Sequence, residues 1–345
     1  MTAPPWVVVL AGGVGSRFWP MSTPQRPKQL LPLVSSQPML RDTMDRLAPL
    51  APPDHSLVLT NASLAAAVRE LLPELPASNV IAEPRPAGTA AALAWAATEI
   101  ARRAGRDAVM LSVHADWAIG DVKAFRATLA LAAESASRER ALVTVGIVPR
   151  SADTGLGYIE PGDVVRGPLH RVARFIEKPD RQRAQALVAA GCLWNSGIFA
   201  WRVGDLLDEV HQHCPEVADA LDRAGDDRDA FFAAARPIAI DVGVLERSSR
   251  VMVLPGDFGW SDVGTWAALL GVRQADRDGN VPSGSTYLRD SSGTVVHADG
   301  PTVVLYGVRD LVVVATGGLT LVTTVERASD LKALLETLPA DVRDR

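Results

Sequence analysis

A glycine turn followed by cations is the feature of this sequence best suited to chemistry. The apolar run 7–10 predicts a buried strand, and it leads into a turn whose glycines are Gly12, Gly13 and Gly15. Because glycine has no Cβ, the backbone can turn sharply there and its N–H groups can approach an anion closely. The cations that follow are Arg17, Arg26 and Lys28. Three cations beside such a turn suit a triphosphate better than a single phosphate; a plain surface loop with solvated cations is the alternative.

The turn matches neither common phosphate motif. A G-x-G-x-x-G pattern would need glycine where Phe18 stands, and a P-loop would need Gly-Lys where the sequence has Ser16-Arg17. Four prolines between residues 20 and 32 keep much of the following stretch from becoming a regular helix. We therefore expect a long, semi-rigid loop over 10–33, in which Leu10 and Ala11 at the strand end join the glycines in binding a nucleotide.

Two aspartates are candidate ligands for a divalent metal. Asp116 follows the buried run 108–113, and an aspartate just past a buried strand suits Mg²⁺, a hard cation that prefers carboxylate oxygen and water. Asp262 is its candidate partner. Asp257 competes within the same loop, but it ranks lower because an acid in a Gly-Asp turn commonly hydrogen-bonds its own backbone.

Glu83 is a candidate for reading a nucleotide base. It follows a short apolar run and is held in an extended segment by Pro84 and Pro86, and Thr89 is a plausible N-cap for the helix that follows. A carboxylate presented this way could accept hydrogen bonds from N1–H and N2–H₂ of guanine, a pairing that adenine and the pyrimidines do not offer. A solvated loop acid is the alternative.

The stretch 149–203 contains a third group of candidates. GLGYIEPG and LWNSGIFAW predict strands, with glycines such as Gly157 at positions of close approach, and RFIEKPD predicts a strand running into a helix that Asp180 caps and Gly191 ends. Lys178 could bind a sugar phosphate, while Glu177 and Asn195 could hydrogen-bond sugar hydroxyls. On the residues alone, a surface ion pair and an asparagine in a turn explain these positions equally well.

Several separated motifs, in the same order, resemble one known family. AGGVGSRFWP followed by RPKQLLPL resembles the signature of the sugar-1-phosphate nucleotidyltransferases, and its FWP and PKQ parts resemble the mannose-1-phosphate guanylyltransferase branch. EPRPAGTAAAL resembles the base-binding segment of that family. GYIE, FIEKP and WNSGIF resemble its sugar-binding half, and GDFGWSDVG resembles the segment that supplies a second metal ligand.

The resemblance implies a reaction and a set of roles. GTP and mannose 1-phosphate would give GDP-mannose and diphosphate by in-line attack on the α-phosphorus, assisted by Mg²⁺ on Asp116 and Asp262. Lys28 would bind the α-phosphate and Arg17 the departing diphosphate. Gly88 and Thr89 would lie beside the nucleoside. Gly157, Glu177, Lys178 and Asn195 would hold the sugar phosphate.

One position departs from the family pattern. Where a histidine usually follows the first aspartate, this chain has Trp117, so the role of that histidine is either absent or supplied by His114. Two alternatives stay open: a transferase for another sugar 1-phosphate or nucleotide, and a catalytically silent sugar-nucleotide-binding paralogue. A Rossmann dehydrogenase is excluded because its glycine fingerprint is missing.

The elements that must position these residues alternate along the chain. Apolar runs at 7–10, 57–60, 108–113 and 142–148 predict strands, and residues 39–50, 62–72, 89–103 and 123–137 predict helices between them. This pattern predicts an α/β fold with a Rossmann-like, doubly wound sheet, in which ligands bind beyond the carboxyl ends of strands. With the resemblance it gives a mixed sheet over 1–280 and a small left-handed β-helix-like domain over 281–345. Ser329 is the expected N-cap of a closing helix there.

Composition sets the remaining limits. The chain has 345 residues and a formal charge of −5, which gives no electrostatic footprint for nucleic acid. Cys192 and Cys214 form no metal pattern and suggest no disulfide scaffold. With no secretion signal and no apolar run long enough to span a membrane, we expect a cytoplasmic enzyme without membrane contact. The family resemblance adds the expectation of a homodimer.

Overall fold

The computed structural model describes residues 3–13 and 15–343. It divides the chain into two compact units. The first comprises residues 3–12, 45–114 and 121–258; the second comprises 13–44, 115–120 and 259–343. The boundaries of these units differ from those of the predicted domains 1–280 and 281–345, and those domains stay a prediction.

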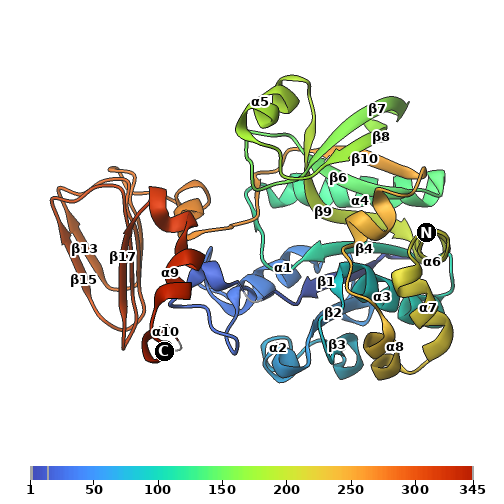
Figure 1. Cartoon of the computed structure of the whole chain (residues 1–345), viewed down its shortest axis with the longest axis horizontal. Coiled ribbons are helices and arrows are strands. Elements are labelled where there is room, and N and C mark those ends of the chain that lie inside the picture. The colour runs from blue at the N-terminus through green and yellow to red at the C-terminus, as the bar shows by residue number, and fades with distance from the viewer. Residues whose placement is uncertain (1–2, 14, 344–345) are drawn as a thin grey trace. The chain divides into compact units, whose positions relative to one another are not determined.

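A mixed sheet organises the first unit (Figure 1). Its nine strands run in the order β3-β2-β1-β4-β9-β6-β10-β8-β7. The strands are β1 (Trp6–Ala11), β2 (Ser56–Asn61), β3 (Val80–Glu83), β4 (Val109–His114), β6 (Leu142–Ile147), β7 (Tyr158–Arg166), β8 (Leu169–Ile176), β9 (Leu193–Arg202) and β10 (Val251–Gly256). β1 pairs in parallel with β2 and β4, whereas β9 is antiparallel to both of its main neighbours, β4 and β6. The predicted doubly wound mixed sheet is thus confirmed.

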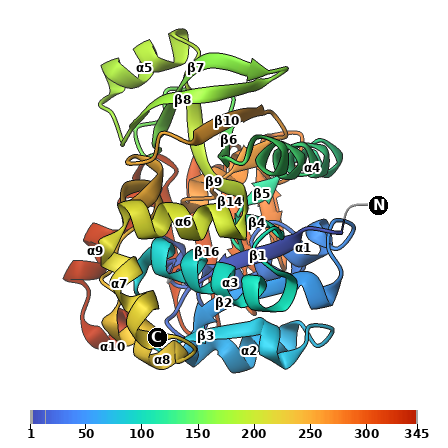
Figure 2. The same ribbon diagram turned by 90° about the vertical axis from the view of Figure 1, so that its right-hand side faces the viewer.

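Helices cover both faces of this sheet. They are α2 (Ala65–Leu71), α3 (Gly88–Ala104), α4 (Val122–Glu139), α5 (Arg181–Ala189), α6 (Val203–His213), α7 (Pro215–Ala224) and α8 (Arg228–Ala234), with the π-helical turn η6 (Asp241–Leu245) and the 3₁₀ turns η3 (Pro53–His55), η4 (Ala62–Leu64) and η5 (Ala77–Asn79). The helices α3 and α6, which lie side by side (Figure 2), and α7 and α8 share one apolar core with Trp6, Val8 and Leu10 of β1. Since β1 is buried on both faces, its sequence is a continuous apolar run.

Most predicted elements are confirmed, but two predicted helix caps are wrong. Helix α3 begins at Gly88 with Ala87 as N-cap, and the Thr89 hydroxyl instead accepts a hydrogen bond from the Ile240 N–H at 2.9 Å. The Thr89 hydroxyl does not cap the helix because the Ile240 N–H already engages it. Gly88 before it has a positive φ of 81° and packs on Ile238, where a Cβ would lie 2.3 Å from the carbonyl oxygen.

The second wrong cap is Ser329. That residue ends the 3₁₀ turn η8 (Glu326–Ser329), and the closing helix α9 (Leu331–Thr337) has Asp330 at its N-cap. The reason is local: the Thr324 hydroxyl accepts a hydrogen bond from the Arg327 N–H at 3.2 Å and starts the turn earlier. By contrast, the predicted cap of α5 is confirmed, because the Asp180 side chain accepts from the Arg183 N–H at 2.8 Å.

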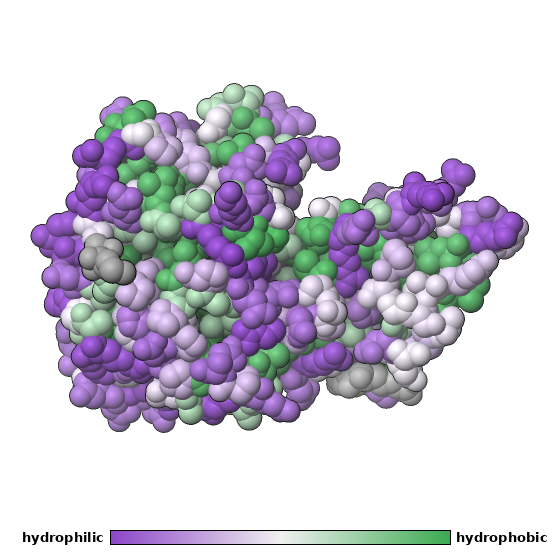
Figure 3. Space-filling model, turned by 180° about the vertical axis from the view of Figure 1, so that it is seen from behind, coloured by the Kyte–Doolittle hydropathy of each residue, from purple (hydrophilic) through white to green (hydrophobic). Residues whose placement is uncertain are grey.

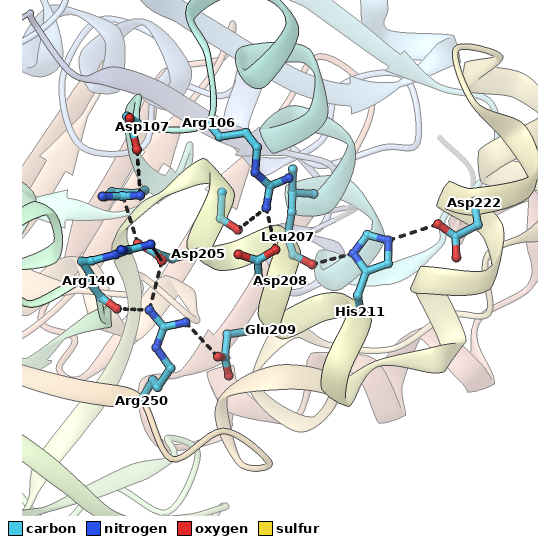
Figure 4. A network of polar contacts seen from close by, with 12 residues as sticks. Arg106, Asp107, Arg140, Asp205, Leu207, Asp208, Glu209, His211, Asp222 and Arg250 are labelled. Atoms are coloured by element: carbon cyan, nitrogen blue, oxygen red, sulfur yellow. Dashed lines mark hydrogen bonds and ion pairs between the residues drawn. The ribbon is translucent and has the colours of Figure 1, made fainter.

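An ion-pair network ties together strand starts at one edge of the sheet (Figure 4). Asp205 near the start of α6 is 1% exposed, and its carboxylate accepts a hydrogen bond from Arg250 at 3.0 Å. Arg202 Nε lies 3.1 Å from the same carboxylate, and Arg250 also reaches Glu209 at 3.1 Å. Because Arg250 directly precedes β10, the network fixes the amino-terminal end of a strand. The opposite, carboxyl-terminal edge of β1, β2 and β3 carries the candidate nucleotide residues.

The second unit contains the β-helix-like region. Its strands are β5 (Ala118–Ile119), β11 (Trp260–Ser261), β12 (Val281–Ser283), β13 (Thr286–Arg289), β14 (Val295–Ala298), β15 (Val303–Tyr306), β16 (Leu311–Ala315) and β17 (Thr320–Thr324). Its helical segments, besides η8 and α9, are η1 (Ser16–Phe18), η2 (Lys28–Leu30), most of α1 (Met39–Leu47), η7 (Trp266–Gly271) and α10 (Ala340–Arg343). Parallel partners lie 17 residues apart in two ladders, Thr286 with Val303 and Val295 with Val312. This regular return of the chain confirms the β-helix-like architecture.

The loop that follows the glycine turn shares its core with the β-helix-like region. Phe18, Trp19, Leu31 and Leu33 belong to the same buried cluster as the valines of β14 and β16. Trp266 links the two parts, because its indole N–H donates to the Trp19 carbonyl at 3.0 Å and its ring lies 5.1 Å from that of Phe18. The C-terminal region therefore has a structural role in holding the cation-bearing loop.

The surface of the molecule is mixed in character. Hydrophilic residues predominate on the face shown in Figure 3, with smaller apolar groups between them. Of the helices within the described residues, none is both long and apolar enough to cross a membrane.

Candidate functional site

Three candidate residues from distant parts of the sequence meet in the second unit. The ammonium group of Lys28 lies 3.0 Å from Asp116 Oδ2 and 2.6 Å from the backbone carbonyl oxygen of Asp262. The Lys28 side chain is only 7% exposed, and that of Asp116 is 32% exposed. A buried ammonium is stable only when it is paired, so these two oxygens define where its charge resides.

A short two-stranded ladder brings the two aspartates together. Strand β5, just after Asp116, pairs antiparallel with β11, just before Asp262. Trp117 packs edge-to-face on Trp260 with ring centroids 5.8 Å apart, and both side chains are buried. The residue that departs from the family pattern therefore has a packing role in this ladder.

Strained backbone follows Asp262. Val263 has a positive φ of 47° although it is β-branched and fully buried, a conformation that costs of order 1–3 kcal/mol. Next comes Gly264, where a Cβ would lie 2.7 Å from Asp262 Oδ2 and 3.2 Å from an Arg17 guanidinium nitrogen. The missing side chain thus leaves room for the Asp262 carboxylate and the exposed Arg17 on the same side of this loop.

The backbone of Gly15 packs closely against Lys28. Its φ of 65° is one that glycine adopts readily, and a Cβ on it would lie 2.4 Å from Lys28 Cβ. The neighbouring residue Gln29 donates from its side-chain amide to the Gly13 carbonyl at 3.0 Å. Close packing of the turn against Lys28 therefore depends on glycine at position 15.

The residues present fit a magnesium ion. Mg²⁺ is usually held by one or two carboxylates together with substrate phosphates and water, so Asp116 and Asp262 are a suitable donor set. Within the residues that the structure describes, no group of three or more His, Cys, Asp or Glu side chains could hold a metal by itself. A metal bound at these aspartates would therefore take its other oxygen ligands from the substrate and from water.

In the first unit, the carboxyl ends of three parallel strands present the nucleotide candidates. Leu10 and Ala11 end β1 and are buried, while Gly12 is exposed. The Asn61 side-chain amide at the end of β2 donates to the Gly12 carbonyl at 3.2 Å. Asn61 is also the register partner of Glu83 on β3. Sequence reasoning missed Asn61, although it directly follows an apolar run.

Glu83 has an unusual environment for an acid. It is 9% exposed, and burial raises its pKa from 4.5 to about 7. Nearby, Arg85 donates to the carbonyls of Ala233 and Ala235 at 2.8 and 2.6 Å, which fixes the segment after Glu83 to the end of α8. A buried carboxylate at a strand end suits a partner that donates hydrogen bonds.

Glu83, Gly88 and Thr89 are all in the first unit, and the last two have partners there. Gly88 packs on Ile238, and the Thr89 hydroxyl oxygen accepts from the Ile240 N–H. The Thr89 O–H remains able to donate. Their contact with a nucleoside stays a prediction.

The sugar-phosphate candidates also come together in the first unit. The Asn195 N–H donates to the Gly157 carbonyl at 2.8 Å, and a Cβ on Gly157 would lie 2.9 Å from Glu177 Oε2. Glu177 forms an ion pair with Lys178 at 2.7 Å, and both side chains are more than 60% exposed. Lys178 has a φ of 36°, a further strained backbone position. The Asn195 amide donates to Asp241 at 2.7 Å, a residue that sequence reasoning also missed.

Comparison with known proteins gives consistent matches. Residues 6–279 match the nucleotidyl transferase family, and residues 288–338 match the MannoseP isomerase/GMP-like beta-helix domain. A mannose-1-phosphate guanylyltransferase of Escherichia coli is 38% identical over 97% of this chain and 74% of its own length. One of Klebsiella pneumoniae is 37% identical with the same coverage. A Thermus thermophilus structure, described as a mannose-1-phosphate geranyltransferase, has a TM-score of 0.90 at 33% identity and covers 97% of this chain and 99% of that one.

Proposed function

This chain belongs to the nucleotidyl transferase family, and we infer that it converts GTP and mannose 1-phosphate into GDP-mannose and diphosphate. The observation that carries this inference is the match to named mannose-1-phosphate guanylyltransferases over 97% of the chain, in a protein whose Lys28, Asp116 and Asp262 are in contact. The same contact speaks against a catalytically silent paralogue, because the charged groups expected for the reaction are present.

The main task in this reaction is to neutralise charge. The attacking sugar phosphate and the α-phosphate are both anionic, and two unit charges 4 Å apart repel by about 4 kcal/mol at an effective dielectric near 20. The attacking phosphate is already ionised, so no general base is needed. The cations Lys28 and Arg17 of the second unit are the groups we propose for the α-phosphate and the departing diphosphate.

We propose Mg²⁺ as the metal, held by Asp116 and Asp262. When bound, it would supply positive charge at the reacting phosphates. The Lys28 ammonium forms an ion pair with Asp116, and the Lys28 side chain is only 7% exposed. A metal at this position would bind the same carboxylate that pairs with Lys28.

For base recognition we propose Glu83. In its ionised form the buried carboxylate accepts hydrogen bonds only, and guanine offers two adjacent donors. The raised pKa means that this ionised form predominates only above about pH 7 in the free enzyme. For the sugar phosphate we propose Lys178, with Glu177, Asn195 and Gly157 beside the hydroxyls.

The test is diphosphate release measured across a panel of nucleoside triphosphates and sugar 1-phosphates, with and without Mg²⁺. We expect the highest kcat/KM for GTP with mannose 1-phosphate, and activity that depends on the added metal. A higher kcat/KM for another pair would overturn the proposed substrates. No turnover with any pair would overturn the proposed activity.

A further inference from the structure

Two irregular backbone segments of the first unit meet at Asn195. The first is a bulge in β9: Val145 of β6 lies opposite Ile198, but the next residue, Gly146, lies opposite Asn195. Ser196 and Gly197 therefore have no opposite residue on β6, and Gly197 adopts a φ of 73°. A bulge bends its strand and re-aims the neighbouring side chains, here that of Asn195.

The second irregular segment is the π-helical turn η6, which begins at Asp241. Single π turns are rare and occur frequently at functional sites. This one packs so closely that a Cβ on Gly243 would lie 2.9 Å from Cys214 Sγ. The turn is also anchored from its preceding residue, because the Ile240 N–H donates to the Thr89 hydroxyl. The backbone that carries the Asp241 side chain is therefore held in place.

The two segments are joined by a side-chain hydrogen bond. Asn195 Nδ2 donates to Asp241 Oδ1 at 2.7 Å, and Asn195 Oδ1 accepts from the Gly197 N–H at 3.3 Å. Both ends of the amide are therefore engaged, which fixes the orientation of its plane. One N–H and one lone pair of the amide remain to hydrogen-bond a ligand.

We propose that Asp241 is a positioning residue for sugar recognition, which sets the Asn195 amide so that its remaining N–H and lone pair meet sugar hydroxyls. This inference rests on the proposed function. It also rests on location, because Asn195 is bonded to Gly157, beside which Glu177 lies. Burial and then the charges of Asp241 and Glu177 raise the pKa of Glu246, so both carboxylates lie near the same group.

The experiment is a double-mutant cycle in the full chain. Diphosphate release gives kcat and both KM values for the wild type, Asp241→Ala, Asn195→Ala and the double variant. We expect Asp241→Ala to raise the KM for mannose 1-phosphate about tenfold, since hydrogen bonds to charged groups are worth more than a factor of ten, with the KM for GTP within about twofold. In the Asn195→Ala background the same change should cause no further rise.

Three controls separate positioning from folding. Asp241→Asn keeps an acceptor oxygen, so its KM for mannose 1-phosphate should be close to the wild-type value. Asp241→Ser is too short to reach Asn195 and should repeat the tenfold rise if Asp241→Ala fails to fold. Asp222→Ala removes an exposed acid whose partner in the same unit is His211, seen in Figure 4, and should change neither KM.

Independent, additive effects of the Asp241 and Asn195 substitutions would overturn the proposal, as would an equal rise in the KM for GTP. The wild-type panel decides the proposed function separately. If another sugar 1-phosphate is the substrate, the proposed function fails, and the same cycle run with that sugar still decides the role of Asp241.

Discussion

Replacing Glu83 by glutamine tests the link between burial and base choice. Glu83 must be ionised to accept both guanine donors, yet burial raises its pKa to about 7. Below that pH, GTP binding includes the free energy of removing the proton, about 1.4 kcal/mol per pH unit. The wild-type KM for GTP should therefore rise about tenfold between pH 8 and pH 6. Glu83→Gln should lack this dependence and lose the preference for GTP over ATP.

The assay is diphosphate release at saturating mannose 1-phosphate from pH 5.5 to 8.5, with GTP and with ATP. The triphosphate itself titrates in this range, but it does so equally in both nucleotides, so the ratio of the two KM values isolates Glu83. A ratio that is constant with pH in the wild type would refute the reasoning. So would an unchanged ratio in Glu83→Gln, which would show that the base is read elsewhere.

The same residue also affects folding. Its folded pKa is raised, so the unfolded chain releases the proton first as pH rises from 4.5, and stability falls until about pH 7. The shift corresponds to about 3 kcal/mol of unfolding free energy. The unfolding free energy of the wild type should therefore fall by about 3 kcal/mol between pH 4.5 and pH 8 relative to that of Glu83→Gln, which lacks this proton. Urea unfolding followed by far-ultraviolet circular dichroism measures both proteins. Parallel pH profiles for the two proteins would contradict the assigned pKa.

Other predictions concern charge, packing and stability. Asp116→Asn and Asp262→Asn should each lower kcat about a hundredfold or more with an unchanged far-ultraviolet circular dichroism spectrum, whereas Asp257→Asn should stay within about twofold. Asp116→Asn should also lower the thermal midpoint, because the buried Lys28 ammonium loses its carboxylate partner. A near-normal rate in Asp116→Asn or Asp262→Asn removes that residue from the mechanism. Gly15→Ala should lower kcat by displacing Lys28, and a normal rate would show that the turn tolerates a Cβ. Asp205→Ala should cost about 1–3 kcal/mol of unfolding free energy measured in urea, because Arg202 and Arg250 lose a buried acceptor although Arg250 keeps Glu209. An unchanged unfolding free energy would show that water replaces the carboxylate.

Periodicity predicted strands β1, β2, β4 and β6 because they are buried along nearly their whole length and are therefore almost continuously apolar. The convergence of Asp116 and Asp262 was expected from residue type and family resemblance. What periodicity could not predict is which core the proline-rich loop joins. Phe18, Trp19 and Leu31 show no helical or strand spacing, so only the three-dimensional fold assigns them to the core of the β-helix-like region.

Asp241 was missed for a different physical reason. Its position depends on a π turn, whose hydrogen-bond pattern has no sequence period of its own, and on the close packing of Gly243 against Cys214. Asn195 was identified as a candidate, but the bulge that re-aims it comes from a register shift between two strands. Irregular backbone of this kind is specified by tertiary packing, and functional residues are concentrated where it occurs.

The substitution at Trp117 bears on whether the enzyme is active. A tryptophan in place of the family histidine would point to lost chemistry if its side chain left the two aspartates unsupported. Instead, it is 7% exposed and packs on Trp260, an aromatic contact worth about 0.5–1.5 kcal/mol beyond the area it buries. Trp117 directly precedes β5 and Trp260 lies in β11, so the contact between the two rings stabilises the ladder beside both aspartates. Since Asp116 and Lys28 remain in contact beside this ladder, the tryptophan supports the ladder by apolar packing, and the charged groups that we propose for the transfer are retained.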